Sequence, residues 1–316
     1  MLSPFSGSFR LFRVAGIQVR LHWSWFVVGW IEIATRSRAY DSPVWNVLEY
    51  LGLFAIVLLH EFGHVLACRQ VGGSSEDIVL WPLGGVALAK PPPRAGAELW
   101  TIAAGPLVNV VLFPVLMLAT EAWSASGWGP QLPDLSRFLF MLWLINKWLL
   151  LFNLLPVYPL DGGQILRSLL WFRLGRARSL RVATGLGFAG LVVLAAYRLA
   201  QRPTDWLWTL VFAYFLGQQC LAGWRHAAAL RVLEALPRHV GLRCRSCGAA
   251  PPRAPVWLCP GCGVRFDAPA SGAVCPQCLS ALPALACADC GAAHPPADWG
   301  VGPRPRGGAG GPVIDI

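Results

Sequence analysis

Three residues with metal-binding and acid–base chemistry stand together at the end of an apolar run. The uncharged segment 51–59 is followed directly by His60, Glu61 and His64, in the sequence HEFGH. Residues four apart on a helix project from one face, so the two imidazoles can bind one zinc ion. Glu61, one position further round, can then act on a water molecule at the metal. Two surface histidines are the alternative, but ionisable residues at membrane depth are costly and favour a functional site.

A catalytic zinc site usually takes three protein ligands and keeps one position open. Asp161 is a candidate third ligand, in the sequence NLLPVYPLDGG at 153–163. Asp-Gly-Gly after two prolines can also be an ordinary turn. The order of the apolar segments favours the ligand, because the second and fourth segments run in the same direction and bring both motifs to the same membrane depth.

The composition is that of a membrane protein that crosses the bilayer several times. Of 316 residues, 55% are hydrophobic and 13% are charged, and the mean hydropathy is +0.52. The first apolar segment has no small-residue cleavage site behind it, so we expect it to remain in the protein. We expect an α-helical polytopic membrane protein with a six-helix core, spanning at about 21–35, 47–67, 97–120, 136–155, 183–199 and 204–222.

The distribution of basic residues predicts the orientation. With the N-terminus in the cytoplasm, eleven of the basic residues near the segment ends lie inside and five lie outside, as the positive-inside rule requires. Six crossings then leave the C-terminus in the cytoplasm as well. We expect a multi-pass protein of a bacterial inner or plasma membrane.

Eight of the ten cysteines form four CxxC pairs after residue 240. In a reducing compartment this spacing indicates zinc rather than disulfides. The first two pairs and the last two pairs each resemble a zinc ribbon that binds one structural zinc, although an interleaved arrangement would use the same residues. The predicted sites are Cys244, Cys247, Cys259 and Cys262 for one ion, and Cys275, Cys278, Cys287 and Cys290 for the other.

The region after the last span divides into three parts. We expect the membrane domain to cover 1–222, a helical linker 223–240, a double zinc ribbon 241–299 and a disordered tail 300–316. The ribbon holds four arginines and three aspartates. Eight thiolates and two zinc ions bring its charge to about −3, which makes nucleic acid an unlikely partner and favours a protein partner.

Several motifs in order resemble the site-2 protease family of intramembrane zinc metalloproteases. They are HExxH, the sequence NxxPxxPLDGG, FRVAGIQVRLHWSW at 12–25, WPLGGVA at 81–87 and AGPLVN at 104–109. The likeness covers roughly residues 10–222. It implies that His60, His64 and Asp161 bind the catalytic zinc and that Glu61 is the general base.

The same resemblance implies roles for residues around the zinc. Asn153 matches an asparagine that helps to hold the substrate or to stabilise the carbonyl oxygen. Gly84 and Gly85 lie in a short apolar stretch that could re-enter the membrane and add the substrate as an extra strand, or could be a simple turn. Asn109 could bind a backbone group or reach the substrate.

These expectations combine into one hypothesis. The chain is predicted to be a zinc endopeptidase that cuts a transmembrane protein within the lipid bilayer, with one catalytic and two structural Zn²⁺ ions. A non-catalytic membrane scaffold that recruits partners through its zinc-ribbon tail is the main alternative. A transporter would be expected to show internal repeats or paired broken helices, and the sequence has neither.

Overall fold

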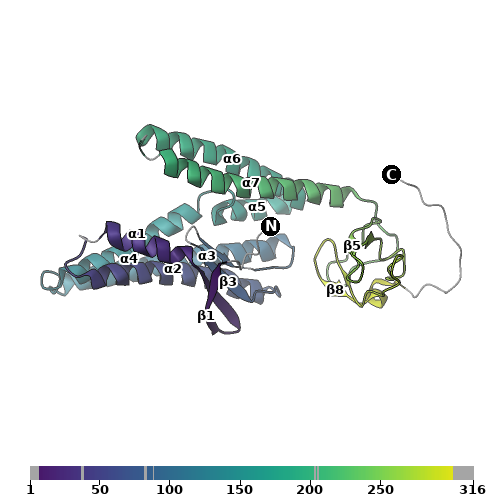
Figure 1. Cartoon of the computed structure of the whole chain (residues 1–316), viewed down its shortest axis with the longest axis horizontal. Helices are drawn as coiled ribbons and strands as arrows, with labels where there is room; N and C mark the ends of the chain where they lie inside the picture. The colour runs from purple at the N-terminus through teal and green to yellow at the C-terminus, as the bar shows by residue number, and fades with distance from the viewer. Residues whose placement is uncertain are drawn as a thin grey trace. The chain divides into compact units, whose positions relative to one another are not determined.

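The computed structural model describes residues 7–36, 39–81, 84–87, 89–202, 204 and 206–301, with the backbone alone at 84–87 (Figure 1). The chain divides into two compact units between Ala228 and Ala229, here called the helical unit and the cysteine unit. The division falls inside one helix, α7 (Trp206–Ala235). The predicted domain limit at 222 also falls inside this helix.

Four helices of the helical unit are long and apolar enough to cross a membrane. They are α2 (Pro43–Gln70), α3 (Ala95–Ala125), α4 (Pro133–Asn153) and α6 (Arg176–Gln201). The predicted count of six is therefore not confirmed for the described part of the chain.

The other two predicted spans are also helices, but one is short and the other is interrupted by polar residues. α1 (Ser24–Thr35) has 12 residues, and at a rise of about 1.5 Å per residue it is shorter than a hydrocarbon core. α7 is long enough, but Gln218 and Gln219 interrupt its apolar sequence.

Proline and glycine mark the ends of several helices. α2 and α4 begin at Pro43 and Pro133, where a missing backbone N–H costs nothing because no partner exists in the first turn. One helix was not predicted: α5 (Asp161–Leu174) begins at the Asp-Gly-Gly sequence and ends before Gly175, which has a positive φ of 79°. The carboxylate of Asp161 is favourable there, because the first turn of a helix carries partial positive charge.

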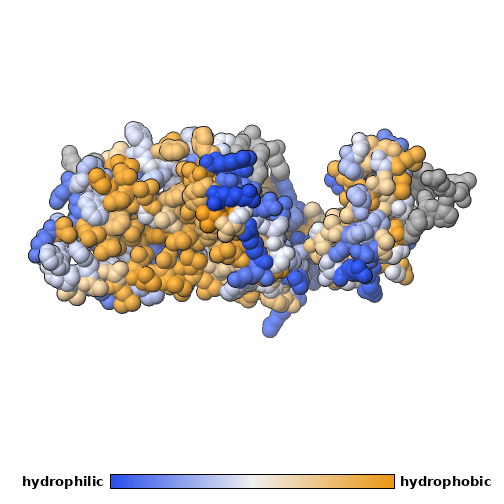
Figure 2. Space-filling model, turned by 90° about the horizontal axis from the view of Figure 1, so that it is seen from below, coloured by the Kyte–Doolittle hydropathy of each residue, from blue (hydrophilic) through white to orange (hydrophobic). Residues whose placement is uncertain are grey.

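Large apolar side chains cover the outer faces of the long helices. Val111, Trp148 and Val193 are 64%, 61% and 68% exposed, and Figure 2 shows hydrophobic residues across the helical unit. Soluble proteins rarely expose apolar surface on this scale. The helical unit is therefore that of an integral membrane protein.

A four-stranded sheet packs against the helices. Its order is β1 (Ser8–Val14), β2 (Ile17–His22), β3 (Asp77–Trp81) and β4 (Gly84–Ala87). β2 and β3 pair in parallel and the other pairs are antiparallel. Alternate residues of β2 and β3 join α1 and α2 in a core of Ile17, Val19, Leu21, Trp25, Val57, Val65, Ile78 and Leu80.

α2 and α3 approach each other closely at Gly63. A Cβ atom at this position would lie 2.6 Å from the carbonyl oxygen of Ala104, so only glycine allows the two backbones to come together here. This contact lies between His60 and His64 in the sequence. It therefore brings α3 within hydrogen-bonding reach of the two imidazoles.

The cysteine unit consists of two short hairpins and a small core. β5 (Trp257–Leu258) pairs with β6 (Arg265–Phe266), and β7 (Leu285–Ala286) pairs with β8 (Ala293–His294). A short 3₁₀ helix, Pro296–Trp299, follows.

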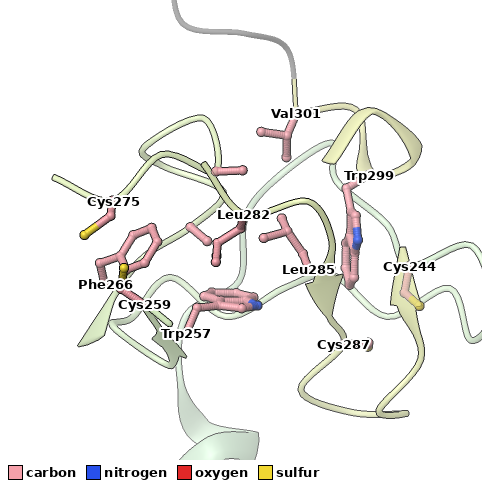
Figure 3. Packing of buried hydrophobic residues seen from close by; sticks show 12 residues of the cluster. Cys244, Trp257, Cys259, Phe266, Cys275, Leu282, Leu285, Cys287, Trp299 and Val301 are labelled. Carbon is pink, nitrogen blue, oxygen red and sulfur yellow. The ribbon is translucent and has the colours of Figure 1, made fainter. Parts of the chain in front are cut away.

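The core of this unit includes Trp299, the last residue before the predicted tail, and Val301, the second residue of that tail. Trp257, Leu285 and Trp299 pack between the hairpins (Figure 3). Val301 is 8% exposed and belongs to the same cluster. The order of the unit thus extends one residue beyond Gly300, where the tail was predicted to begin, and 302–316 lie outside the described residues.

A buried carboxylate joins α2 to the segment before it. Glu49 is 5% exposed and pairs with Arg36, and the Tyr40 hydroxyl donates a hydrogen bond to its second oxygen. Arg36 also pairs with Glu32 at 3.2 Å, but the Glu32 side chain is 40% exposed. Glu32 and Glu49, the two acidic partners of Arg36, therefore differ mainly in how deeply they are buried.

We expect Glu49→Gln to lower the free energy of unfolding by about 2 kcal/mol, because it replaces hydrogen bonds to a buried charged group by weaker ones to an amide. Glu32→Gln is the matched control, and its exposed pair should contribute less than about 1 kcal/mol. Denaturant unfolding of both variants in the same detergent measures the difference. Equal effects would show that burial of Glu49 does not govern this cluster.

Candidate metal centres

His60 and His64 lie one helical turn apart on α2, and both are buried. Their Nε2 atoms are 3.1 Å apart, and their ring planes meet at 82°. The helix thus directs two ring nitrogens at one point.

Asp161 reaches the same point from the start of α5. Its Oδ2 atom lies 3.0 Å from His60 Nε2 and 3.6 Å from His64 Nε2. Ligand atoms around a tetrahedral zinc ion stand about 3.3 Å apart, given bonds of about 2.0–2.1 Å. The structure therefore brings the three predicted ligands together at a spacing that fits zinc.

Hydrogen bonds from α3 fix which nitrogen of each ring is available. His60 Nδ1 lies 2.6 Å from Asn109 Oδ1, and His64 Nδ1 lies 2.9 Å from the carbonyl oxygen of Thr101. Both partners are acceptors, so each Nδ1 carries the hydrogen of the neutral ring. Each Nε2 lone pair then points toward Asp161, as a metal site requires.

A second asparagine holds the first. Asn109 Nδ2 donates to Asn146 Oδ1 at 2.7 Å, and Asn146 Nδ2 donates to the Asn109 carbonyl oxygen at 3.0 Å. Both side chains are fully buried. Asn109 thus lies where it orients His60, and its predicted contact with substrate stays a prediction. Asn146 was missed, although a buried amide in an apolar span was itself a signal.

Gly105 leaves room for the two imidazoles. A Cβ atom there would lie 2.8 Å from His60 Nε2 and nearer still to His64 Nε2. The position of Gly105 against both ring nitrogens indicates that it keeps the metal position open.

Glu61 is 5% exposed and lies in the same cluster. One of its carboxylate oxygens and one ring nitrogen each of His60 and His64 all lie within 4.8 Å of one another. A carboxylate at this distance can act as a base beside a metal without being a ligand.

The remaining predicted residues lie on neighbouring elements. Asn153 is half-buried at the end of α4, seven residues after Asn146 and so on nearly the same helix face. Gly84 and Gly85 lie in β4, the last strand in the order of the sheet, and pair with Trp81 and Leu80 of β3. β4 packs against α2. The roles of these residues stay predictions.

The cysteines form two clusters, but not the predicted ones. The outer pairs come together, and so do the inner pairs, so the prediction that neighbouring pairs share a zinc was wrong. Each strand pair, β5–β6 and β7–β8, encloses only one CxxC pair, so local strand pairing does not decide which pairs share an ion. The two sets are Cys244, Cys247, Cys287 and Cys290, and Cys259, Cys262, Cys275 and Cys278.

Sulfur positions within both sets suit zinc. Cross-pair Sγ distances are 3.6 and 3.8 Å in the outer set, and 3.4 and 3.6 Å in the inner set. Zinc–sulfur bonds of about 2.3 Å in a tetrahedron place sulfurs about 3.8 Å apart.

All four CxxC pairs have the same local turn. The residue after each pair donates its backbone N–H to the first cysteine at 2.8–3.0 Å. Three of these residues are glycines with positive φ, and the fourth is Leu279, with φ of 60°. Hydrogen bonding to Ser280 also lowers the pKa of the Cys278 thiol to about 6, which favours the thiolate that binds zinc.

Two family profiles match the helical unit. The profile of peptidase M50B-like proteins matches residues 28–160, and that of peptidase family M50 matches residues 130–197. Together they include the HExxH sequence and the Asp161 motif.

Curated proteins and a solved structure are similar over a longer stretch. A zinc metalloprotease of Methanocaldococcus jannaschii is 34% identical over 67% of this chain and 60% of its own length. Stage IV sporulation protein FB of Bacillus subtilis is 28% identical over 60% and 64%. The solved site-2 protease from M. jannaschii is 27% identical, with a TM-score of 0.49 over 69% of this chain and 95% of that one. The chain thus spans less than two thirds of the length of these curated relatives.

Gly105→Ala should abolish metal binding at the histidine cluster, because the new methyl group would occupy the space in front of both Nε2 atoms. Gly96→Ala on the same helix is the control, since its Cβ would meet only Phe172 Cζ at 3.9 Å. Zinc content per chain by mass spectrometry should fall by one ion in the first variant alone. Full zinc content in Gly105→Ala would contradict the assigned metal position.

The cysteine clusters can be tested by paired substitutions. Cys244→Ser with Cys287→Ser changes one cluster, so it should release one zinc. Cys244→Ser with Cys259→Ser changes both clusters, so it should release two. Pairing in sequence order would give the reverse result in the same zinc measurement.

Proposed function

Because the chain belongs to the peptidase M50 family of site-2 proteases, we propose that it is a zinc endopeptidase acting within the membrane. Its substrate is a transmembrane protein, cut in or near a membrane-spanning helix. The observation that carries this proposal is the triangle of His60, His64 and Asp161, with the carboxylate of Glu61 beside it.

Each residue of the cluster has a distinct task. His60, His64 and Asp161 hold the zinc, and Asn109 and Thr101 keep the imidazoles in the tautomer that exposes Nε2. When bound, zinc polarises the scissile carbonyl and makes a neighbouring water more acidic.

The proton transfers belong to the protein. Glu61 takes a proton from the attacking water and passes it to the leaving amine. Asn153 donates a hydrogen bond to the carbonyl oxygen as charge develops on it. This role is supported by the position of Asn153 on nearly the same helix face as Asn146, whose amide chain reaches His60.

The depth of the site suits a cut near the cytoplasmic face. His64 and His60 lie six and ten residues before the end of α2, which corresponds to about 9 and 15 Å along the helix axis. With the N- and C-termini in the cytoplasm of a bacterial cell, water needs only a short polar path from that side. The reducing cytoplasm also suits the eight clustered thiols.

The strand β4 offers a place for the unwound substrate. A helix must be extended before its peptide bonds can be cut, and an extended segment can pair with a free sheet edge. β4 pairs with β3 alone among the described strands, and its position against α2 supports it as the strand that receives substrate. Gly84 and Gly85 allow close backbone approach there.

The cysteine unit is proposed to bind a protein partner or to control access to the site. Its two clusters fit structural zinc, and its small core needs such support. The non-catalytic scaffold is not favoured, because it gives no reason for a buried three-ligand triangle with a carboxylate beside it.

Glu61→Gln should reduce cleavage of a reconstituted transmembrane substrate by at least about 1,000-fold, because the amide cannot accept the proton. Zinc content should stay at the wild-type level, since Glu61 is not a ligand. Glu76→Gln, at an exposed position before β3, is the control and should cleave normally. Undiminished turnover in Glu61→Gln would refute the proposed mechanism.

A further inference from the structure

The loop of residues 154–160, which leads from α4 to Asp161, is closed by its own hydrogen bonds. Val157 N donates to the Leu155 carbonyl at 2.7 Å, and Leu160 N donates to the Val157 carbonyl at 2.9 Å. At the start of α5, a Cβ atom on Gly163 would lie 2.7 Å from Tyr158 Cα. The loop before Asp161 is therefore in direct contact with the first turn of α5 after it.

α6 and α7 hold this loop from outside. A Cβ atom on Gly223 of α7 would lie 2.6 Å from Thr184 Cγ2 of α6 and 2.8 Å from the Tyr158 ring. One on Gly187 of α6 would lie 2.7 Å from the Tyr158 carbonyl oxygen. The Cys220 thiol of α7 donates to that carbonyl at 3.0 Å. We call Gly187, Cys220 and Gly223 the tyrosine socket.

The neighbouring residue of the loop is held in the same way. A Cβ atom on Gly190 of α6 would lie 2.6 Å from Val157 Cγ2. Gly187 and Gly223 thus lie against Tyr158, and Gly190 lies against the preceding residue, Val157. An added methyl group at any of these positions would force the loop, the helices or both to shift.

We infer that Tyr158 is a positioning residue for the metal centre, and that the tyrosine socket sets the place of Asp161. This inference rests on the proposed role of Asp161 as a zinc ligand. Tyr158 and Asp161 are three residues apart, and the contacts of Gly163 join the loop to the helix that carries the carboxylate. A metal ligand must stand within a few tenths of an ångström of its place, so a displaced loop weakens the site.

The described contacts separate this role from general packing. The close contacts of the socket reach Tyr158, whereas the orientation of His60 and His64 comes from α3. A disturbed socket should therefore affect the third ligand alone. Loss of an outer support typically weakens metal binding by about 10- to 100-fold.

Two matched pairs of glycine variants test the socket. Gly187→Ala adds a methyl group against the Tyr158 carbonyl, and Gly223→Ala adds one against both the Tyr158 ring and Thr184. The controls lie on the same helices: the Cβ of Gly217→Ala would meet Leu191 Cδ2 at 3.6 Å, and that of Gly185→Ala would meet Trp224 Cζ3 at 3.8 Å. We expect at least tenfold weaker binding of the helical-unit zinc in the first two variants and wild-type binding in the controls.

Zinc retained per chain after dialysis against buffered free zinc gives this affinity without any assay of cleavage. The ions of the cysteine clusters remain as an internal measure of folding, together with a single peak in size exclusion. Tyr158→Ala should lose the same zinc ion, and Tyr158→Phe should keep it, because the shape of the ring fills the socket.

The outcomes separate the inference from the proposed function. His60→Ala must lose the helical-unit zinc for either to stand. Loss in His60→Ala with full retention in Gly223→Ala and Tyr158→Ala would overturn the inference alone. Full retention in all three would remove the proposed function and the inference together.

Discussion

The hydrogen bonds from α3 to the two imidazole Nδ1 atoms are the interaction on which the metal centre depends. Hydrocarbon cannot satisfy a polar group, so each ring must find its partner inside the protein. The Thr101 carbonyl and the Asn109 amide supply those partners only because α2 and α3 touch at Gly63 and because Gly105 has no side chain. A wider separation of the helices would release both rings at once.

The two kinds of metal site in this chain obtain their order from different sources. In the helical unit, two of the predicted ligands stand on the long helix α2 and the third begins α5, and the packing around them prepares the metal position. In the cysteine unit, strands of two residues surround a small core of Trp257, Leu285 and Trp299. Zinc ions bound by the two cysteine clusters would supply much of the stability of such a unit, as they do in small zinc domains generally.

The sequence predicted those parts of the fold that depend on local spacing. The four-residue interval of His60 and His64 sets one helix face, and the hydropathy of the long segments indicates a membrane protein. The order of apolar segments was enough to suggest Asp161. Contacts set by packing could not be predicted from the sequence. The Asn109–Asn146 pair, for example, requires knowledge of which helix faces meet. The cysteine partition likewise depends on how distant CxxC pairs pack in space, and their distance in the sequence does not indicate it.

α7 has a mechanical consequence for the loop before Asp161. Cys220 and Gly223 are three residues apart on this helix and so share one side of it, and both lie against Tyr158. Any rotation of this part of α7 about its own axis would carry both away from Tyr158 in the same motion, so the two supports of the loop are gained or lost together.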